Sequence, residues 1–334
     1  MDDDTKNFAD VHADVSCDTD YVPSAIEVVE SLDAFGTGLL SVGSIFSVLT
    51  IYFAVDACHN IIYQKDSKFY KGNAIVILSV YPVASVCSLM AIAIPRGQLL
   101  SEAVTQIFLT ISFYRLYLLL LDIGRRRINE TPALMLRVGP CCCWPCLPFP
   151  NLQMTDANLS WLRILALQFP IVQGLLYFIM LFITAEERAL ATQYSVYLQP
   201  VMVISILLGI YSVTIVTKTL HAVAPEANLH FKALVSQLVL LCSKLQAGII
   251  KGLPATGLFP CNPPLTPTIY ANVTYNSLML FEMLLLCYAA RHVYYVEPEK
   301  NQEENAIDRL PRTINQEPTN SNDGNKQLPT IVTA

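Results

Sequence analysis

Four of the ten cysteines in this chain lie within six positions of one stretch, RVGPCCCWPCLPFP at residues 137–150. They are Cys141, Cys142, Cys143 and Cys146. Four thiolates could hold a zinc ion, and a C-x-x-C spacing could form a redox pair. Cysteines beside a membrane can carry acyl chains, and buried thiols can simply pack. The choice among these depends on the compartment, and therefore on how the chain crosses a membrane.

Acylation is the interpretation that these cysteines favour. Neighbouring cysteines seldom converge on one tetrahedral metal ion, no histidine lies nearby, and no thioredoxin-like pattern of strands and helices surrounds them. Trp144, Leu147 and Phe149 make the stretch apolar, as expected of a loop held at a membrane surface. Each buried CH₂ of an acyl chain contributes about 0.8 kcal/mol to membrane attachment. We therefore predict S-acylation of all four cysteines, and we expect no metal and no cofactor.

A second group of residues places polar chemistry inside apolar stretches. An ionisable residue at the centre of a bilayer costs about 2.5–3.5 kcal/mol on insertion scales, so such residues are usually paired or functional. Gln237, Lys244 and Lys251 are spaced by seven and fall on one face of a helix. A polar stripe opposite an apolar face is typical of a helix that lines a cavity or groove. The candidate residues of a solute path are Gln237, Lys244, Gln246, Glu282, Glu102 and Gln106.

Two ion pairs are expected within these stretches. Lys244 and Glu282 lie on consecutive spans at depths that differ by about 3 Å, which predicts a pair near the midplane. That pair could be a latch between helices, or Lys244 could attract the head group of an anion. Arg115 and Asp122 are seven residues apart on one face, and they are expected to form a structural ion pair.

The elements that carry these residues are long apolar stretches. The chain is 53% hydrophobic and only 14% charged, with a mean hydropathy of +0.44. A helix needs about 20 apolar residues to cross a bilayer. Seven stretches reach that length: 34–55, 74–94, 98–121, 164–183, 194–216, 233–253 and 272–294. The sequence therefore predicts an all-α membrane protein with seven transmembrane helices (34–295).

Lysine and arginine in the short loops predict the orientation, because such loops stay cytoplasmic. Loops 61–73, 122–160 and 217–232 carry nine of these residues, and the other side carries three. The acidic N-terminal segment (1–33) is therefore expected outside, and the polar, disordered tail (296–334) inside.

The same topology assigns the cysteines to two compartments. The cysteine cluster falls in the cytoplasmic loop 122–160, where structural disulfides are rare. Only Cys17 and Cys261 face outward, which leaves a disulfide between these two open.

Several function classes lack their signatures in this sequence. Nothing is basic enough for nucleic acid, and neither a phosphate-binding loop nor a catalytic Ser/His/Asp set is present, so we expect no enzyme. Seven spans with an outer N-terminus also describe G-protein-coupled receptors. Yet the third span ends in LLLLDIGRRR and the last reads FEMLLLCYAARHVYY, without the receptor motifs. Without an ATPase module, transport would be facilitated or coupled to an ion.

The sequence resembles the organic solute transporter alpha-subunit family (Ost-alpha), to which the transmembrane protein 184 group is related. The shared motifs are Glu130-Thr131-Pro132, Gly139-Pro140 followed by the cysteine run, Pro145-Cys146, and Ile94-Pro95-Arg96 at the end of the second span. Lys232, Gln237 and Gln246 keep the family's K-x4-Q-x8-Q spacing. The chain departs from the vertebrate pattern in a shorter cysteine run with Trp144, and in Lys244, where a neutral residue is usual.

The resemblance implies a multi-pass protein of the plasma membrane that moves bile acids, steroid conjugates and similar amphipathic anions down their gradients. In vertebrates the alpha subunit works with a small single-span beta subunit, and family members also self-associate. We therefore expect a facilitative transporter whose partners are the lipid bilayer and an amphipathic organic anion, with a beta subunit or self-association left open. The alternative is a multi-pass scaffold or signalling protein that does not transport. A seven-helix receptor is less favoured.

Overall fold

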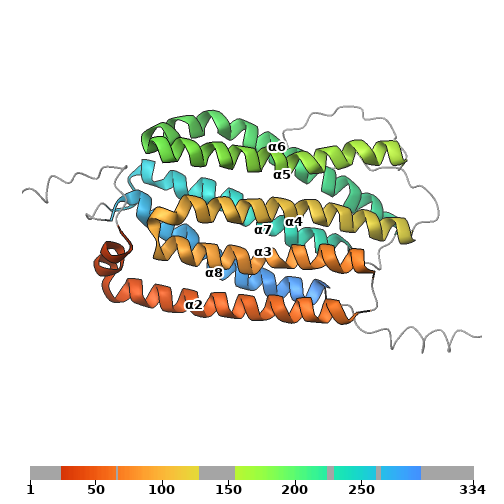
Figure 1. Cartoon of the computed structure of the whole chain (residues 1–334), viewed down its shortest axis with the longest axis horizontal. Coiled ribbons are helices and arrows are strands. Elements are labelled where there is room, and N and C mark those ends of the chain that lie inside the picture. The colour runs from red at the N-terminus through yellow and green to blue at the C-terminus, as the bar shows by residue number, and fades with distance from the viewer. Residues whose placement is uncertain (1–23, 65–66, 128–154, 224–228, 261–264, 295–334) are drawn as a thin grey trace, which may run out of the picture. The chain divides into compact units, whose positions relative to one another are not determined.

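The computed structural model describes residues 24–64, 67–127, 155–223, 229–260 and 265–294. The regular elements of this part of the chain are helices (Figure 1). The seven long ones are α2 (Ala25–Tyr63), α3 (Lys68–Ala93), α4 (Gln98–Arg127), α5 (Asp156–Glu186), α6 (Arg188–Val223), α7 (Leu229–Gly252) and α8 (Pro267–Tyr294). Two short 3₁₀ turns, Pro95–Gly97 and Leu253–Thr256, follow α3 and α7.

All seven helices are long and apolar enough to cross a membrane, which confirms the predicted fold class. Their apolar segments run for 24 to 30 residues, longer than most of the predicted spans. Helices extend past the apolar core because their polar ends keep their backbone hydrogen bonds in the interface. α2, for example, begins at Ala25 inside the acidic N-terminal segment, where Ser24 and Glu27 form a capping box.

The helices pack in two layers (Figure 1). α2, α3, α4 and α5 lie side by side in chain order, and α6, α7 and α8 return along the other side. α8 contacts both α2 and α3, and α4 contacts both α6 and α7. The largest buried side chains lie between the layers, among them Tyr81, Phe113, Tyr117 and Phe169.

Apolar side chains also cover the outer faces of the bundle. Val48 on α2 and Phe182 on α5 are each 64% exposed, and similar residues follow the outward faces of most helices. In water such a surface would aggregate, whereas in a bilayer it faces lipid chains. The polar residues of the interior are therefore the ones that need explanation.

Candidate functional site

One face of α7 joins three other helices through polar side chains. Gln237 Nε2 donates to Thr214 Oγ1 on α6 at 3.2 Å. Lys244, two turns further along, reaches α5, and Lys251, another two turns on, reaches α4. The spacing by seven thus gives a ladder of polar contacts that runs along the inside of α7.

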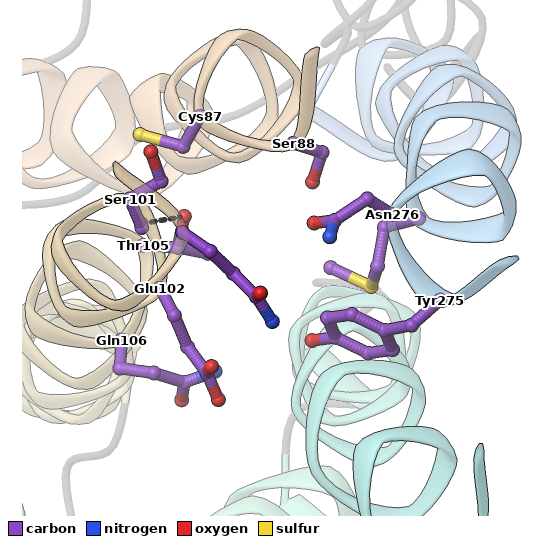
Figure 2. Close-up of a pocket in the computed structure, with 10 residues that line it drawn as sticks. Cys87, Ser88, Ser101, Glu102, Thr105, Gln106, Tyr275 and Asn276 are labelled. Atoms are coloured by element: carbon purple, nitrogen blue, oxygen red, sulfur yellow. Dashed lines mark hydrogen bonds between the residues drawn. The ribbon is translucent and has the colours of Figure 1, made fainter. Parts of the chain in front are cut away.

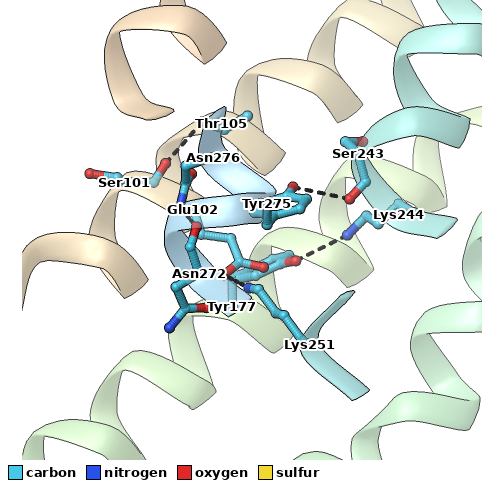
Figure 3. Close-up of polar contacts among 10 residues, drawn as sticks. All are labelled: Ser101, Glu102, Thr105, Tyr177, Ser243, Lys244, Lys251, Asn272, Tyr275 and Asn276. Carbon is cyan, nitrogen blue, oxygen red and sulfur yellow. Dashed lines mark hydrogen bonds and ion pairs between the residues drawn. The ribbon is translucent and has the colours of Figure 1, made fainter. Parts of the chain in front are cut away.

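Lys244 bridges from α7 to α5. Its Nζ donates to the hydroxyl of Tyr177 at 3.0 Å (Figure 3). It also donates to Gln173 Oε1 at 3.3 Å. The ammonium also lies 4.9 Å from the centre of the Tyr177 ring, within the range of a cation–π contact. Both partners are neutral, so the positive charge is solvated without being cancelled.

Lys251 and Glu102 form an ion pair between α7 and α4 (Figure 3). The ring of Tyr275 on α8 lies 5.2 Å from Lys251 Nζ, and its hydroxyl donates to the Ser243 carbonyl at 3.1 Å. Four helices therefore meet around two lysines and one carboxylate. Among the described residues, no acid lies within ion-pair distance of Lys244.

The expected pair between Lys244 and Glu282 is wrong. Glu282 Oε1 instead accepts from Gln246 Nε2 at 2.9 Å, between α8 and α7. Gln246 comes two residues after Lys244, which turns it by about 200° around the helix axis. Lys244 and Glu282 therefore lie on opposite sides of α7, although their depths were predicted to match.

Gln106 lies in a small polar pocket between α3, α4 and α8 (Figure 2). Its side chain is 1% exposed, and Ser88 and Asn276 face the same space. Glu102, one turn earlier on α4, also lines the pocket. The cavity volume is about 10 Å³, room for a single water molecule.

A larger, wide-open groove runs along the N-terminal half of α6. It has a volume of about 650 Å³ and is lined by residues of this helix alone, namely Ser195, Val196, Gln199, Pro200, Val203 and Ile204. Val196 and Val203 continue the α6 face that carries Thr214, because 11 and 18 residues complete whole helical turns. That face meets α7 at Gln237 and is exposed further out, where Val196 is 69% and Val203 47% accessible.

Gln173 connects this groove with Lys244. Its Nε2 donates to the carbonyl of Met202, the neighbour of Val203, at 3.0 Å, while its Oε1 accepts from Lys244. The side chain is fully buried. The side chain of Gln173 therefore bridges the Lys244 ammonium and the backbone of α6 next to the groove.

The expected ion pair between Arg115 and Asp122 stays a prediction. Arg115 Nη1 donates to Asn73 Oδ1 on α3 at 3.4 Å, which joins α4 to α3. Cys17, Cys261 and the four clustered cysteines lie outside the described residues. In the part of the chain that the structure describes, no group of acidic, histidine or cysteine side chains could hold a metal ion.

The structure adds residues that sequence reasoning missed. Gln173 and Tyr177 are one turn apart in an apolar stretch, a spacing that could have marked a polar face on α5. Lys232, noted only for its spacing, is 6% exposed and donates to the Tyr70 hydroxyl at 3.1 Å. Its ammonium lies 5.3 and 5.6 Å from the ring centres of Tyr70 and Tyr294.

Comparison with known proteins agrees with this arrangement. The family profile described as "Organic solute transporter Ostalpha" matches residues 39–300, which include every described membrane helix except the first turns of α2. The chain is 23% identical over 283 residues to "Organic solute transporter subunit alpha" of Danio rerio, covering 81% of this chain and 86% of the relative. It is 25% identical to "Organic solute transporter alpha-like protein" of Drosophila melanogaster, covering 81% and 84%.

A further relative is "Organic solute transporter alpha-like protein 3" of Caenorhabditis elegans, 29% identical over 295 residues, or 85% of this chain and 81% of that protein. No solved structure matches the chain. The profile covers well over half of the sequence, and it includes the polar face of α7 and its partners on α4, α5 and α8. The chain belongs to the organic solute transporter Ostalpha family.

Proposed function

We propose that this protein is a facilitative transporter of amphipathic organic anions, such as steroid conjugates or bile-acid-like solutes, across the plasma membrane. The observation that carries the proposal is a half-buried lysine joined through Gln173 to the helix that carries an open apolar groove. Lys244 supplies a positive charge held by neutral groups, and the α6 face from Val196 to Ile204 supplies apolar surface. An amphipathic anion needs these two features next to each other.

Size favours the groove over the interior as the place for the solute body. Pockets that bind small molecules have volumes of about 300–1,000 Å³. The groove, at about 650 Å³, falls within that range, whereas the pocket around Gln106 holds about 10 Å³. A steroid-sized body would therefore lie along α6 with one side against lipid, and its charged end would reach inward.

The net charge of the cluster around Lys244 favours an anionic over a cationic group at the end of the solute that points inward. Glu102 is paired with Lys251, so the cluster around them keeps one positive charge, on Lys244. A solute carboxylate or sulfate would replace Gln173 and Tyr177 as the partner of that ammonium. Charge-assisted hydrogen bonds contribute about 1.5–3 kcal/mol, roughly twice a neutral one.

The test is solute flux into vesicles that contain this chain alone. Tritiated estrone sulfate or taurocholate should move down its gradient in both directions, and Lys244→Met should lower flux at low solute concentration about 10- to 100-fold. Lys71→Met is the matched control, because among the described residues Lys71 Nζ donates to the Ile62 carbonyl at an exposed helix end. Its flux should equal that of the unchanged protein.

Two results would contradict the proposal. Equal flux in Lys244→Met and Lys71→Met would remove Lys244 from the solute path. No flux from folded, unchanged protein in either direction would favour a protein that needs a second subunit or does not transport. Adding a single-span beta subunit to the same vesicles separates these two cases.

The proposal includes an orientation, with the N-terminus outside and the groove in the outer half of the membrane. Arg96 in the turn after α3 and Lys68 at the start of α3 would then lie on opposite sides. In intact cells, with Cys17 and Cys261 first replaced by serine, a membrane-impermeant thiol reagent should label Arg96→Cys and leave Lys68→Cys unlabelled. The reverse pattern would overturn the orientation.

A further inference from the structure

The contact between Glu282 and Gln246 is unusual for a carboxyl group at this depth. Glu282 lies near the middle of α8 and is half-buried between α8 and α7. Its Oε1 accepts one hydrogen bond from Gln246 Nε2. Its other oxygen, Oε2, is buried, and so is the Oε1 of Gln246; among the described residues neither oxygen accepts a hydrogen bond of standard geometry, and the uncharged Cys242 thiol, a weak donor, lies within reach of the carboxyl.

The two oxygens without donors belong to groups that are already joined by one hydrogen bond. If the Glu282 carboxylate is ionised, its Oε2 and the Gln246 Oε1 are both acceptors and cannot hydrogen-bond to each other. A proton on Glu282 Oε2 turns that oxygen into a donor, and the Gln246 oxygen can then accept from it. A carboxylic acid and a primary amide joined in this way form a ring with two hydrogen bonds, which leaves neither oxygen unsatisfied.

Among the residues that the structure describes, none places a positive charge beside Glu282 that would hold it ionised. On α7, Cys242 lies beside the carboxyl, while Lys244 and Lys251 bond on the other side of that helix. α2 approaches α8 here through Phe46, which contacts Phe281, and through Gly43 near Leu280. The parts of α2 and α3 that face this level, residues 38–50 and 76–90, have no charged residue. Tyr275, on α8 itself, is neutral and bonded to Ser243.

We propose that Glu282 is a proton-binding site within the membrane and that its protonated carboxyl forms a two-hydrogen-bond pair with the amide of Gln246. The proton comes from solvent and returns to it, and it is shared between Glu282 Oε2 as donor and Gln246 Oε1 as acceptor. An isolated carboxylate at this depth costs several kcal/mol, which protonation avoids. The pair joins α7 to α8 on the side of α7 opposite to Lys244.

This site has a consequence for solute selection, which rests on the proposed function. With Glu282 neutral, the local group of Lys244, Lys251 and Glu102 has a net charge of +1. Loss of the proton would add one negative charge across α7 from this group and weaken the attraction for an anion. The proton on Glu282 therefore sets the charge that an anionic solute meets at Lys244.

Infrared spectroscopy of the purified protein tests the proton directly and does not depend on transport. The carbonyl stretching band of a protonated carboxylic acid should be present at neutral pH and lost in Glu282→Gln. Glu102→Gln is the matched control, because Glu102 is ion-paired and should contribute no such band. The glutamine at 282 can still pair with Gln246 as amide with amide, so this variant should fold.

The outcomes are distinct. A protonated-acid band that disappears in Glu282→Gln and shifts to higher frequency in Gln246→Met supports the pair, since removal of the amide takes a hydrogen bond from the acid. A spectrum that Glu282→Gln leaves unchanged overturns the proposal.

In flux assays, the KM for estrone sulfate should rise from neutral to alkaline pH more steeply in the unchanged protein than in Glu282→Gln, where only Lys244 can still lose a proton. The same pH dependence in both would overturn the role in solute selection, whereas absent flux concerns only the proposed function.

Discussion

Separating Glu102 from Lys251 by mutation should destabilise the bundle unequally, depending on which partner is removed. Glu102→Gln leaves two lysines, Lys244 and Lys251, without a carboxylate between α4, α5 and α7. Lys251→Met leaves Glu102 with Lys244 still within electrostatic range. In Glu102→Gln the two lysines repel each other with no carboxylate to offset them. In Lys251→Met the Glu102 carboxylate is still attracted to Lys244. Glu102→Gln should therefore be the more damaging of the two.

The magnitude follows from burial. Removing one partner of a fully buried pair costs about 3–5 kcal/mol. The side chains of Lys251 and Glu102 are 30% and 19% exposed, so a loss of about 2–3 kcal/mol is expected for Glu102→Gln and about 1 kcal/mol for Lys251→Met. For a chain of this size each kcal/mol lowers Tm by about 2–4 °C. Thermal unfolding of the purified variants measures both shifts.

The double variant Glu102→Gln/Lys251→Met decides whether the effect comes from the pair. Replacing both charges leaves no isolated ion, so the double variant should be more stable than Glu102→Gln alone, with a coupling energy of about 1–2 kcal/mol. Additive losses would mean that the two residues act separately. Equal losses in the two single variants would refute the argument that Lys244 compensates Glu102.

Two further predictions concern packing. Tyr70→Phe removes the hydrogen bond from Lys232 but keeps the ring beside it, so unfolding should become easier by about 1–2 kcal/mol in the same thermal assay. Unchanged stability would show that the ring alone holds the ammonium. Gly209→Ala would place a Cβ 3.1 Å from the Phe169 ring and should cost about 1–3 kcal/mol, whereas Gly248→Ala, with open space around it, should be neutral or stabilising. Equal effects of the two alanines would refute the close approach of α5 and α6.

The membrane helices could be predicted from the sequence because a bilayer imposes one simple rule of length and polarity. Each apolar stretch of about 20 residues had to become a helix, since no other element spans a bilayer without closing into a barrel. The polar stripe on α7 followed from the spacing of Gln237, Lys244 and Lys251 in the same way. These inferences use only neighbours along the chain.

The partners of those residues could not be predicted, because they depend on which helices lie next to each other and on how each is turned. Depth alone suggested Lys244 and Glu282 as a pair, but rotation about α7 places Glu282 with Gln246. Lys251 finds its carboxylate on α4, a helix 149 residues away in the sequence. No local pattern encodes that neighbour, since the two-layer arrangement arises from the packing of all seven helices.

If Lys244 binds the solute as proposed, its contacts link solute binding to the bridge between α5 and α7. In the described conformation its ammonium is held by Gln173 and Tyr177, and Gln173 is held in turn by the Met202 carbonyl of α6. A solute anion can reach the ammonium only by displacing these neutral partners. Because a ligand shifts a conformational equilibrium by its difference in affinity for the two states, an anion that binds only the displaced state favours it. The lysine that would attract the solute therefore also keeps α5 against α7 in its absence.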